Sequence, residues 1–224
     1  MAIDGALLAA ADAPTLRLYG WQPHAVSLGY FQAIADFDDL PAETSVVRRA
    51  TGGGAIYHGD ELTYSLALDA AALPKELAAS YALLHDAIVR ALSSMGVRCH
   101  RALDGRMSAR PEDRWCFAHP VQGDLMTDRG KLCGSAQRRE RGRVLHHGSL
   151  VIQRPELTPF VAAIADQVSP TAELRRGLHE AITREIAASL SMQPCHGELD
   201  ERESRLAADL EREVFGSEDH IARR

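Results

Sequence analysis

The segment Gly130-Lys131-Leu132-Cys133-Gly134-Ser135-Ala136-Gln137 is the most informative stretch of this 224-residue chain. Its pattern predicts a β-strand, and glycines at 130 and 134 allow other atoms to approach the backbone closely. Lys131 is one of only two lysines in a chain that otherwise carries its positive charge on arginine. A lysine ammonium is compact and responds to its surroundings, so we expect Lys131 to have a chemical role.

Working outward from this strand, alternating and amphipathic segments follow one another along the chain. They predict a single α+β domain over residues 1–224, with a mixed or antiparallel sheet packed against helices and a helical part from about residue 156. We expect a hairpin between 46–49 and 62–68, a loop over 103–115 and a frayed end from 216 to 224. The remaining expected strands are 15–21, 25–29, 97–101, 124–127, 131–137 and 144–152, and the expected helices are 2–11, 75–95 (stopped at Gly96), 156–167, 171–191 and 200–215.

Composition places the chain among soluble globular proteins, with 46% hydrophobic and 25% charged residues. No apolar run approaches the length of a membrane span, and the acidic first turn indicates a helix start and no signal peptide. Four widely spaced cysteines favour reduced thiols in a cytoplasm, and a monomer is the default expectation. The net charge of −6 argues against nucleic-acid binding as the main activity.

A cluster of arginines stands out on this acidic chain. Arg138, Arg139, Arg141 and Arg143 lie close together. Such a patch suits a focused anionic partner, either a phosphate-bearing ligand or an acidic carrier protein. It is also what a solvated charged loop would contain, and the sequence leaves both interpretations open.

The run Thr51-Gly52-Gly53-Gly54 predicts a loop whose backbone amides can close on a ligand. Neither a Walker motif nor a dinucleotide-binding glycine motif is present. Arg48 and Arg49 directly precede the run, and we expect them at the mouth of the site, where guanidinium groups favour an anionic or carbonyl-bearing ligand. The alternative is a simple hairpin turn.

Cys116 is the best candidate for a nucleophile. It follows a polar stretch and precedes an expected strand, and a nearby Lys131 would favour its thiolate form. The alternative is a buried structural cysteine, which is the role we expect for Cys133.

His146 and His147 are adjacent, so in a strand they point to opposite faces and at most one can face a site. Without further ligands at suitable spacing they make a poor metal motif, and we expect no metal.

Taken together, these blocks resemble the catalytic domain shared by lipoate–protein ligases, octanoyl/lipoyl transferases and biotin–protein ligases. The resemblance runs nearly end to end and is specific for the lipoyl branch. The blocks that carry it are Leu16-Arg17-Leu18-Tyr19-Gly20-Trp21, Ser27-Leu28-Gly29-Tyr30-Phe31-Gln32, Arg48 to Ala55, Lys131 with Gly134-Ser135-Ala136-Gln137, and His147-Gly148-Ser149.

Within that family the chain is similar to the octanoyl-carrier-protein transferases typified by the Bacillus enzyme. Trp115-Cys116-Phe117 ahead of the lysine strand and Asp60 to Ser65 match that branch, whereas Gly54 is a feature of the ligases. The resemblance implies transfer of an octanoyl (or lipoyl) group from octanoyl-acyl-carrier protein, through a Cys116 thioester, to a lysine of a lipoyl-accepting protein. The acceptor would be glycine-cleavage H protein or an E2 lipoyl domain, and no cofactor would be required.

The resemblance also implies roles for the site residues. Cys116 and Lys131 would be catalytic, with the Gly52–Gly54 and Gly134 amides roofing the pocket. The substrate-binding residues would be Arg48, Arg49, Thr51, Gly52, Gly53, Gly54, His58, Gly134, Ser135, Ala136, His147 and Gly148.

Two alternatives remain open. One is an ATP-dependent lipoate–protein ligase that acts through lipoyl-adenylate with ATP and Mg²⁺. Such ligases usually carry a C-terminal accessory domain, and this chain is too short for a full one. The other is a non-catalytic acyl-binding module, against which the retention of Lys131 argues.

Overall fold

The computed structural model describes residues 1–104 and 114–222, which form two β-sheets covered by helices. The larger sheet has the strand order β1-β5-β9-β8-β7-β6, and all its neighbouring strands are antiparallel. Its strands are β1 (Thr15–Tyr19), β5 (Glu61–Asp69), β6 (His100–Arg101), β7 (Leu125–Thr127), β8 (Gly130–Glu140) and β9 (Arg143–Val151).

The smaller sheet has the order β3-β2-β4, in which β2 is parallel to β3 and antiparallel to β4. Its strands are β2 (Ala25–Leu28), β3 (Ser45–Arg48) and β4 (Ile56–His58). The expected α+β class with a mixed or antiparallel sheet is confirmed.

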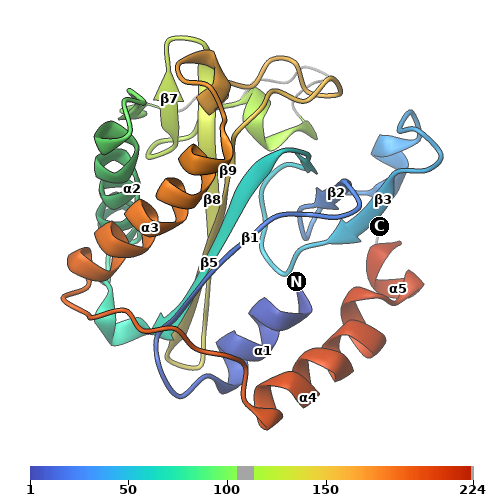
Figure 1. Ribbon diagram of the computed structural model, residues 1–224. Coiled ribbons are helices and arrows are strands. Elements are labelled where there is room, and N and C mark those ends of the chain that lie inside the picture. The colour runs from blue at the N-terminus through green and yellow to red at the C-terminus, as the bar shows by residue number, and fades with distance from the viewer. Residues whose placement is uncertain (105–113, 223–224) are drawn as a thin grey trace.

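Helices cover the large sheet on both faces (Figure 1). On one side α2 (Leu77–Ser94) and α3 (Ala172–Ser189) pack together, and on the other α1 (Ala2–Ala10) packs against α4 (Glu201–Leu210). The chain continues from α4 through a π-helical turn, η6 (Glu211–Phe215), into α5 (Glu218–Ile221). Short 3₁₀ turns are η1 (Ile34–Phe37), η2 (Ala70–Ala72), η4 (Cys116–Ala118) and η5 (Ile164–Asp166).

The main core lies between the large sheet and the α2–α3 pair. Strand β5 shows how it is built: Leu62, Tyr64, Leu66 and Leu68 point toward the helices, whereas Ala67 packs with α1. Both faces of β5 are buried because helices cover both, and this accounts for its central place in the sheet.

Helix ends follow the expected chemistry. Gly96, with φ of +80°, ends α2 as expected, and Val97 N–H bonds back to Leu92 O. The Thr171 hydroxyl caps α3 by accepting from Leu174 N–H, and Asp200 with Glu203 forms a capping box on α4.

The expected hairpin between 46–49 and 62–68 is wrong. Strand β3 pairs with β2, and β5 pairs with β1 and β9. The glycine run between them is a loop folded onto its own arginine, so it does not return the chain as a hairpin turn.

The expected helix 156–167 is also wrong, because only η5 forms there. Pro159 is the fourth residue of the segment and has no backbone N–H to donate, which disfavours a helix that runs through it from residue 156. The expected strand 97–101 is reduced to His100–Arg101, and most of the expected loop 103–115 lies outside the described residues.

The expected frayed end is wrong for residues 216–222, because α5 forms there and Arg48 binds it, whereas residues 223–224 lie outside the described part of the chain. The guanidinium of Arg48 is fully buried and donates to the carbonyl oxygens of Gln32 at 2.6 Å, Gly29 at 3.0 Å and Ile221 at 2.7 Å. It therefore holds α5 against the loop that follows β2, and its expected position at the mouth of the site is wrong.

We expect Arg48→Lys to lower the free energy of unfolding by about 2–4 kcal/mol, because one ammonium cannot satisfy carbonyls on both sides. Urea denaturation measures the change. The exposed Arg205→Lys on α4 is the control and should stay within about 0.5 kcal/mol of wild type. Equal stability of the two variants would contradict the bracing role of Arg48.

Candidate active site

Cys116 and Lys131 lie side by side, as the sequence predicts. Cys116 opens η4 and Lys131 is the second residue of β8. Lys131 Nζ is 3.4 Å from Cys116 Sγ and 3.1 Å from Cys116 O. The lysine is only 2% exposed, whereas the cysteine is half-buried, so the thiol can be reached and the ammonium is shielded.

Asp124 completes this group, although in the sequence it was only part of the family resemblance and no place in the site was predicted for it. One of its carboxylate oxygens, Oδ2, lies 2.7 Å from Lys131 Nζ and accepts from Val121 N–H at 2.7 Å. Burial disfavours the charge on Lys131, but Cys116 and Asp124 outweigh it and raise the pKa of Lys131. Lys131 is therefore a cation at neutral pH. The available signal was an acidic residue directly before an apolar strand.

Gly134 provides the space for Lys131. A Cβ at position 134 would lie 2.5 Å from Lys131 Cε and 2.7 Å from Nζ, so any side chain there would displace the lysine. The expected close approach at this glycine is confirmed, and the approaching group is the side chain of Lys131, three residues earlier on the same strand.

The other cysteines differ from Cys116. Burial raises the pKa of Cys133 well above its ordinary value and that of Cys99 to about 11. Cys133 is a core residue, as expected. Cys195 is exposed and lies after α3.

Arg49 holds the glycine loop in place. It donates to Ser27 O at 2.7 Å and to Gly54 O at 2.8 Å, and it is 3% exposed, so it lies inside the site and not at its mouth. The loop in turn contacts the segment that holds Cys116, because Cys116 N–H donates to Ala55 O at 2.8 Å. A Cβ on Gly54 would come within 2.7 Å of Cys116 N, which explains the glycine there.

A cavity of about 40 Å³ joins most of the predicted site residues. Neither Arg48 nor Lys131 lines it. Thr51 and Gly54 do not line it either, but they bond to His147 and Arg49, which do. The predicted residues that line it are Arg49, Gly52, Gly53, His58, Cys116, Gly134, Ser135, Ala136, His147 and Gly148.

A larger cavity of about 450 Å³ shares Met1 and His147 with the first one. It lies between α1, β9 and the helices after residue 200. Its apolar walls include Leu8, Leu145, Leu206, Leu210, Val214 and Phe215.

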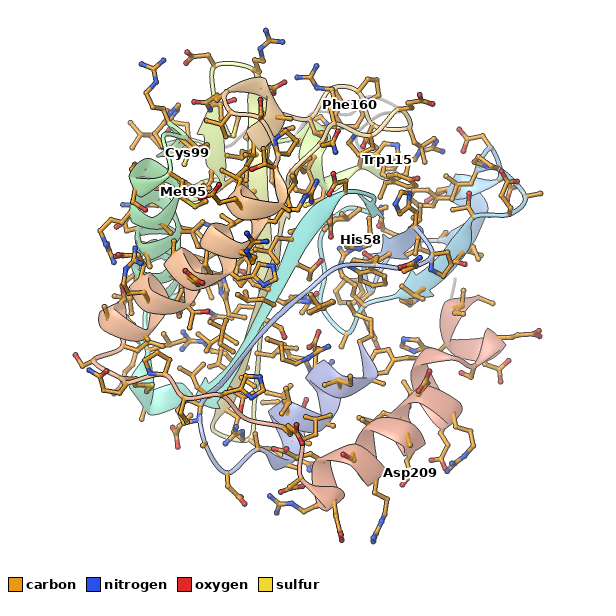
Figure 2. All side chains as sticks on the ribbon, viewed as in Figure 1. His58, Met95, Cys99, Trp115, Phe160 and Asp209 are labelled. Atoms are coloured by element: carbon orange, nitrogen blue, oxygen red, sulfur yellow. The ribbon has the colours of Figure 1, made fainter. Side chains whose placement is uncertain are left out.

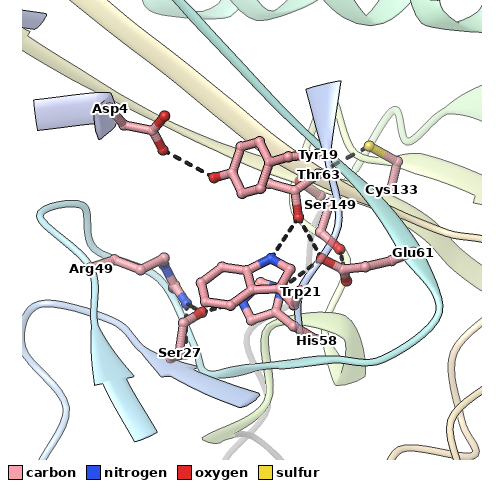
Figure 3. Close-up of polar contacts among 11 residues, drawn as sticks. Asp4, Tyr19, Trp21, Ser27, Arg49, His58, Glu61, Thr63, Cys133 and Ser149 are labelled. Atoms are coloured by element: carbon pink, nitrogen blue, oxygen red, sulfur yellow. Dashed lines mark hydrogen bonds and ion pairs between the residues drawn. The ribbon is translucent and has the colours of Figure 1, made fainter. Parts of the chain in front are cut away.

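One wall of the smaller cavity is a buried polar cluster around His58 (Figure 3). The ring lies between the two sheets (Figure 2), where its nitrogens contact Ser27 Oγ and Glu61 Oε1, both at 2.6 Å. Trp21 stacks on it with ring centroids 4.0 Å apart. Glu61 also accepts from the hydroxyls of Thr63 and Ser149, and this carboxylate was not predicted from the sequence.

His146 and His147 face opposite sides of β9, as predicted. His146 contacts Tyr64 and Gln137 on the α2 side, whereas His147 Nε2 lies 2.7 Å from Thr51 Oγ1 beside the cavity. Burial lowers the pKa of His147 to about 4, so it is neutral at pH 7.

Among residues 1–104 and 114–222, no group of three or more His, Cys, Asp or Glu is arranged to hold a metal ion. No helix in the same two ranges is long and apolar enough to cross a membrane.

The lowered pKa of His147 predicts how the free energy of unfolding depends on pH. An unfolded histidine has a pKa near 6.5, so between about pH 6.5 and pH 4 the unfolded chain binds a proton that the folded His147 does not. The free energy of unfolding should fall with decreasing pH by on the order of 1.4 kcal/mol per unit, roughly 3 kcal/mol in total, from this residue. His147→Gln should flatten the curve measured by urea denaturation, and the exposed His179→Gln should not. Identical slopes in the two variants would refute the assignment.

Comparison with known proteins gives a consistent family. The model of the lipoyl protein ligase A/B catalytic domain matches residues 1–193. Proteins named octanoyltransferase LipM are 41% identical in Exiguobacterium sp., 39% in Kyrpidia tusciae and 30% in Symbiobacterium thermophilum. The matches cover 75%, 68% and 96% of this chain, and 65%, 61% and 90% of those relatives. For the first two, the chain thus spans less than two thirds of the relative's length.

Solved structures agree on the fold. A lipoate-protein ligase A bound with ATP superposes with a TM-score of 0.80 at 21% identity, covering 99% of this chain and 92% of that one. A bipartite lipoate protein ligase from Thermoplasma acidophilum gives 0.76 at 21% identity, covering 99% and 89%. On the family match and these relatives, the chain belongs to the lipoyl protein ligase A/B catalytic-domain family.

Proposed function

We propose that this protein transfers an octanoyl (or lipoyl) group from octanoyl-acyl-carrier protein to a lysine of a lipoyl-accepting protein, through a thioester on Cys116. The observation that carries the proposal is that Cys116 lines a cavity and that the buried Lys131 ammonium lies 3.4 Å from its Sγ. The relatives named octanoyltransferase LipM support the same activity.

In the first half of the reaction, the Cys116 thiolate attacks the carbonyl carbon of the octanoyl thioester. A new carbon–sulfur bond forms, the bond to the carrier sulfur breaks, and the departing thiolate takes up the proton that Cys116 released. Lys131 acts as a cation and not as a base, because its ammonium is already paired with Asp124. It stabilises negative charge on sulfur and on the carbonyl oxygen as they develop.

In the second half, the neutral amine of the acceptor lysine attacks the Cys116 thioester. The carbon–nitrogen bond of the amide forms, the bond to Cys116 breaks, and the proton lost by the amine balances the thiol that is restored. The acceptor is glycine-cleavage H protein or an E2 lipoyl domain. No cofactor takes part in either half.

The acyl tail would extend from Cys116 past Gly134 and Gly148 toward His147, which lines both the smaller and the larger cavity. Neutral His147 costs less to cover with hydrocarbon than a charged one would. Burial of the tail contributes about 0.8 kcal/mol per methylene.

The arginines near the β8–β9 turn would receive the acidic carrier. Arg138 donates to Ala50 O, directly before Thr51, so this patch adjoins the glycine loop. Arg141 is 92% exposed at the turn, although Glu140 offsets part of the charge. We further propose that the protein works as a monomer in the cytoplasm, where Cys116 would remain a free thiol.

The first test is a matrix of donors and variants. Wild type incubated with octanoyl-carrier protein and no acceptor should gain one octanoyl mass on the Cys116 peptide, and acceptor should then be octanoylated without ATP. Cys116→Ala should lose both products by orders of magnitude, because the nucleophile is gone, and Cys195→Ala should keep them.

Two other results would overturn the proposal. Transfer of free lipoate that needs ATP and Mg²⁺ and survives Cys116→Ala would identify a ligase. Octanoyl binding without transfer from either donor would identify an acyl-binding module.

The second test replaces Lys131 with arginine, which keeps the charge. The wider guanidinium does not fit between Asp124 and Gly134, so transfer should fall by roughly a hundredfold or more. Turnover should fall far more than the melting temperature. Lys75→Arg, at the chain's only other lysine, is exposed and should keep wild-type rates. Near wild-type transfer by Lys131→Arg would rule out the proposed role.

A further inference from the structure

His85 has no part in the proposed chemistry, yet it is fully buried and both of its ring nitrogens are bonded. It lies on α2, which packs on the face of the sheet opposite α1. Its two short hydrogen bonds go to the two chain segments that surround the Lys131 side chain, and its Nε2 also lies 3.4 Å from the Tyr64 hydroxyl.

The first contact is with the segment that carries Asp124. His85 Nδ1 lies 2.5 Å from the carbonyl oxygen of Gly123, the residue directly before Asp124. A carbonyl oxygen only accepts hydrogen bonds, so Nδ1 carries the proton. The turn at this point uses a φ of +96° at Gly123, and the Asp124 carboxylate extends from it to Lys131.

The second contact is with β8. His85 Nε2 lies 2.7 Å from Ser135 Oγ, and Ser135 directly follows Gly134, where the missing Cβ leaves room for Lys131. Burial lowers the pKa of His85, so the ring is neutral. With the proton on Nδ1, Nε2 accepts from the Ser135 hydroxyl.

One rigid ring therefore fixes the distance between the turn that presents Asp124 and the strand that bears Lys131. Small displacements matter here, since a shift on the order of 1 Å in a reacting group can cost about a hundredfold in rate. We propose that His85 is a positioning residue that holds Asp124 and β8 in register around Lys131, and so holds Lys131 beside Cys116. This proposal rests on the proposed roles of Cys116 and Lys131.

Three variants separate the two bonds. His85→Phe keeps the ring volume and loses both bonds. His85→Asn can keep the bond to Gly123, because its amide nitrogen matches Nδ1, and His85→Gln can keep the bond to Ser135. Should His85→Phe fail to fold, the two amide variants still provide the test.

The readout is the rate at which iodoacetamide alkylates Cys116, followed by mass spectrometry across pH and divided by the rate at exposed Cys195 in the same molecule. The groups whose charge acts at Cys116 are Lys131 from β8 and Arg49 from the glycine loop, with Tyr81 on α2 also facing it. Loss of Lys131 from its place should make the thiolate harder to form.

We expect His85→Phe to lower the Cys116-to-Cys195 ratio at neutral pH by roughly tenfold to a hundredfold, and to shift the Cys116 profile to higher pH. The ratios for His85→Asn and His85→Gln should lie between those of His85→Phe and wild type. In the transfer assay kcat should fall while KM changes little, because the variant leaves the acyl pocket itself unchanged.

His146→Phe is the matched control. His146 is equally buried and contacts Tyr64 and Gln137, and its ring also contacts that of His85, with ring centroids 5.7 Å apart. Its loss therefore disturbs the same buried network but leaves the His85 bonds to Gly123 and Ser135 in place. It should lower stability and leave the alkylation profile unchanged. If the His85 variants shift the profile no more than His146→Phe does at similar loss of stability, His85 is a structural residue only and the proposal fails. Alkylation needs no acyl donor, so the shift could appear even if octanoyl transfer fails.

Discussion

The ion pair between Lys131 and Asp124 is the constraint on which the rest of the site depends. Removing an ammonium from water costs several kcal/mol unless a partner of opposite charge lies close by, and here the two groups are 2.7 Å apart and both buried. The pair is neutral overall, so the interior can hold it, while Nζ still faces the sulfur of Cys116. Gly134 must lack a side chain because the lysine occupies that space. The turn before β7 must hold the Asp124 carboxylate at a fixed distance from Lys131. The hydrogen bond from His85 to Gly123 O in that turn therefore matters for the ion pair.

The two adjacent arginines show how this chain uses guanidinium groups inside its structure. Successive residues in extended chain point to opposite sides, so Arg48 and Arg49 serve different segments. Arg48 donates hydrogen bonds to carbonyl oxygens of the loop after β2 and of α5, whereas Arg49 donates to those of Ser27 and the glycine loop. A guanidinium has five donors in a fixed plane, and irregular loops offer carbonyls with no partner in a helix or sheet. Two cations beside a glycine run are therefore internal braces here, although the same pattern in sequence suggests a ligand-binding mouth.

The sequence predicted the elements whose signal is local, and failed where long-range contacts decide. Helices α1, α2 and α3 and most strands of the large sheet follow from periodicity. The neighbours of β5 could not be predicted in the same way. A central strand has a neighbour on each side, and the alternation of its own residues does not identify the strands that pair with it. In 156–167 the apolar run Val161 to Ile164 is buried with only the short turn η5 at its end, and Phe160 is exposed. The short α5 has little helix signal of its own, and its order comes from Arg48, far away in sequence.

The residues of the site also divide into those that the sequence could predict and those that depend on long-range contacts. Cys116 and Lys131 could be found because each residue type has one dominant chemistry and few copies in this chain. Asp124 and Glu61 could not, because a carboxylate is common and only its contacts distinguish a buried partner from a solvated one. His146 and His147 show the limit most clearly: alternation places them on opposite faces, but only the fold tells which face holds the cavity. The strands β8 and β9 thus connect two environments, a core packed by α2 and a cavity closed by the glycine loop. Residues such as Ser135 belong to both, which is why a side chain on α2 can govern the geometry at Lys131.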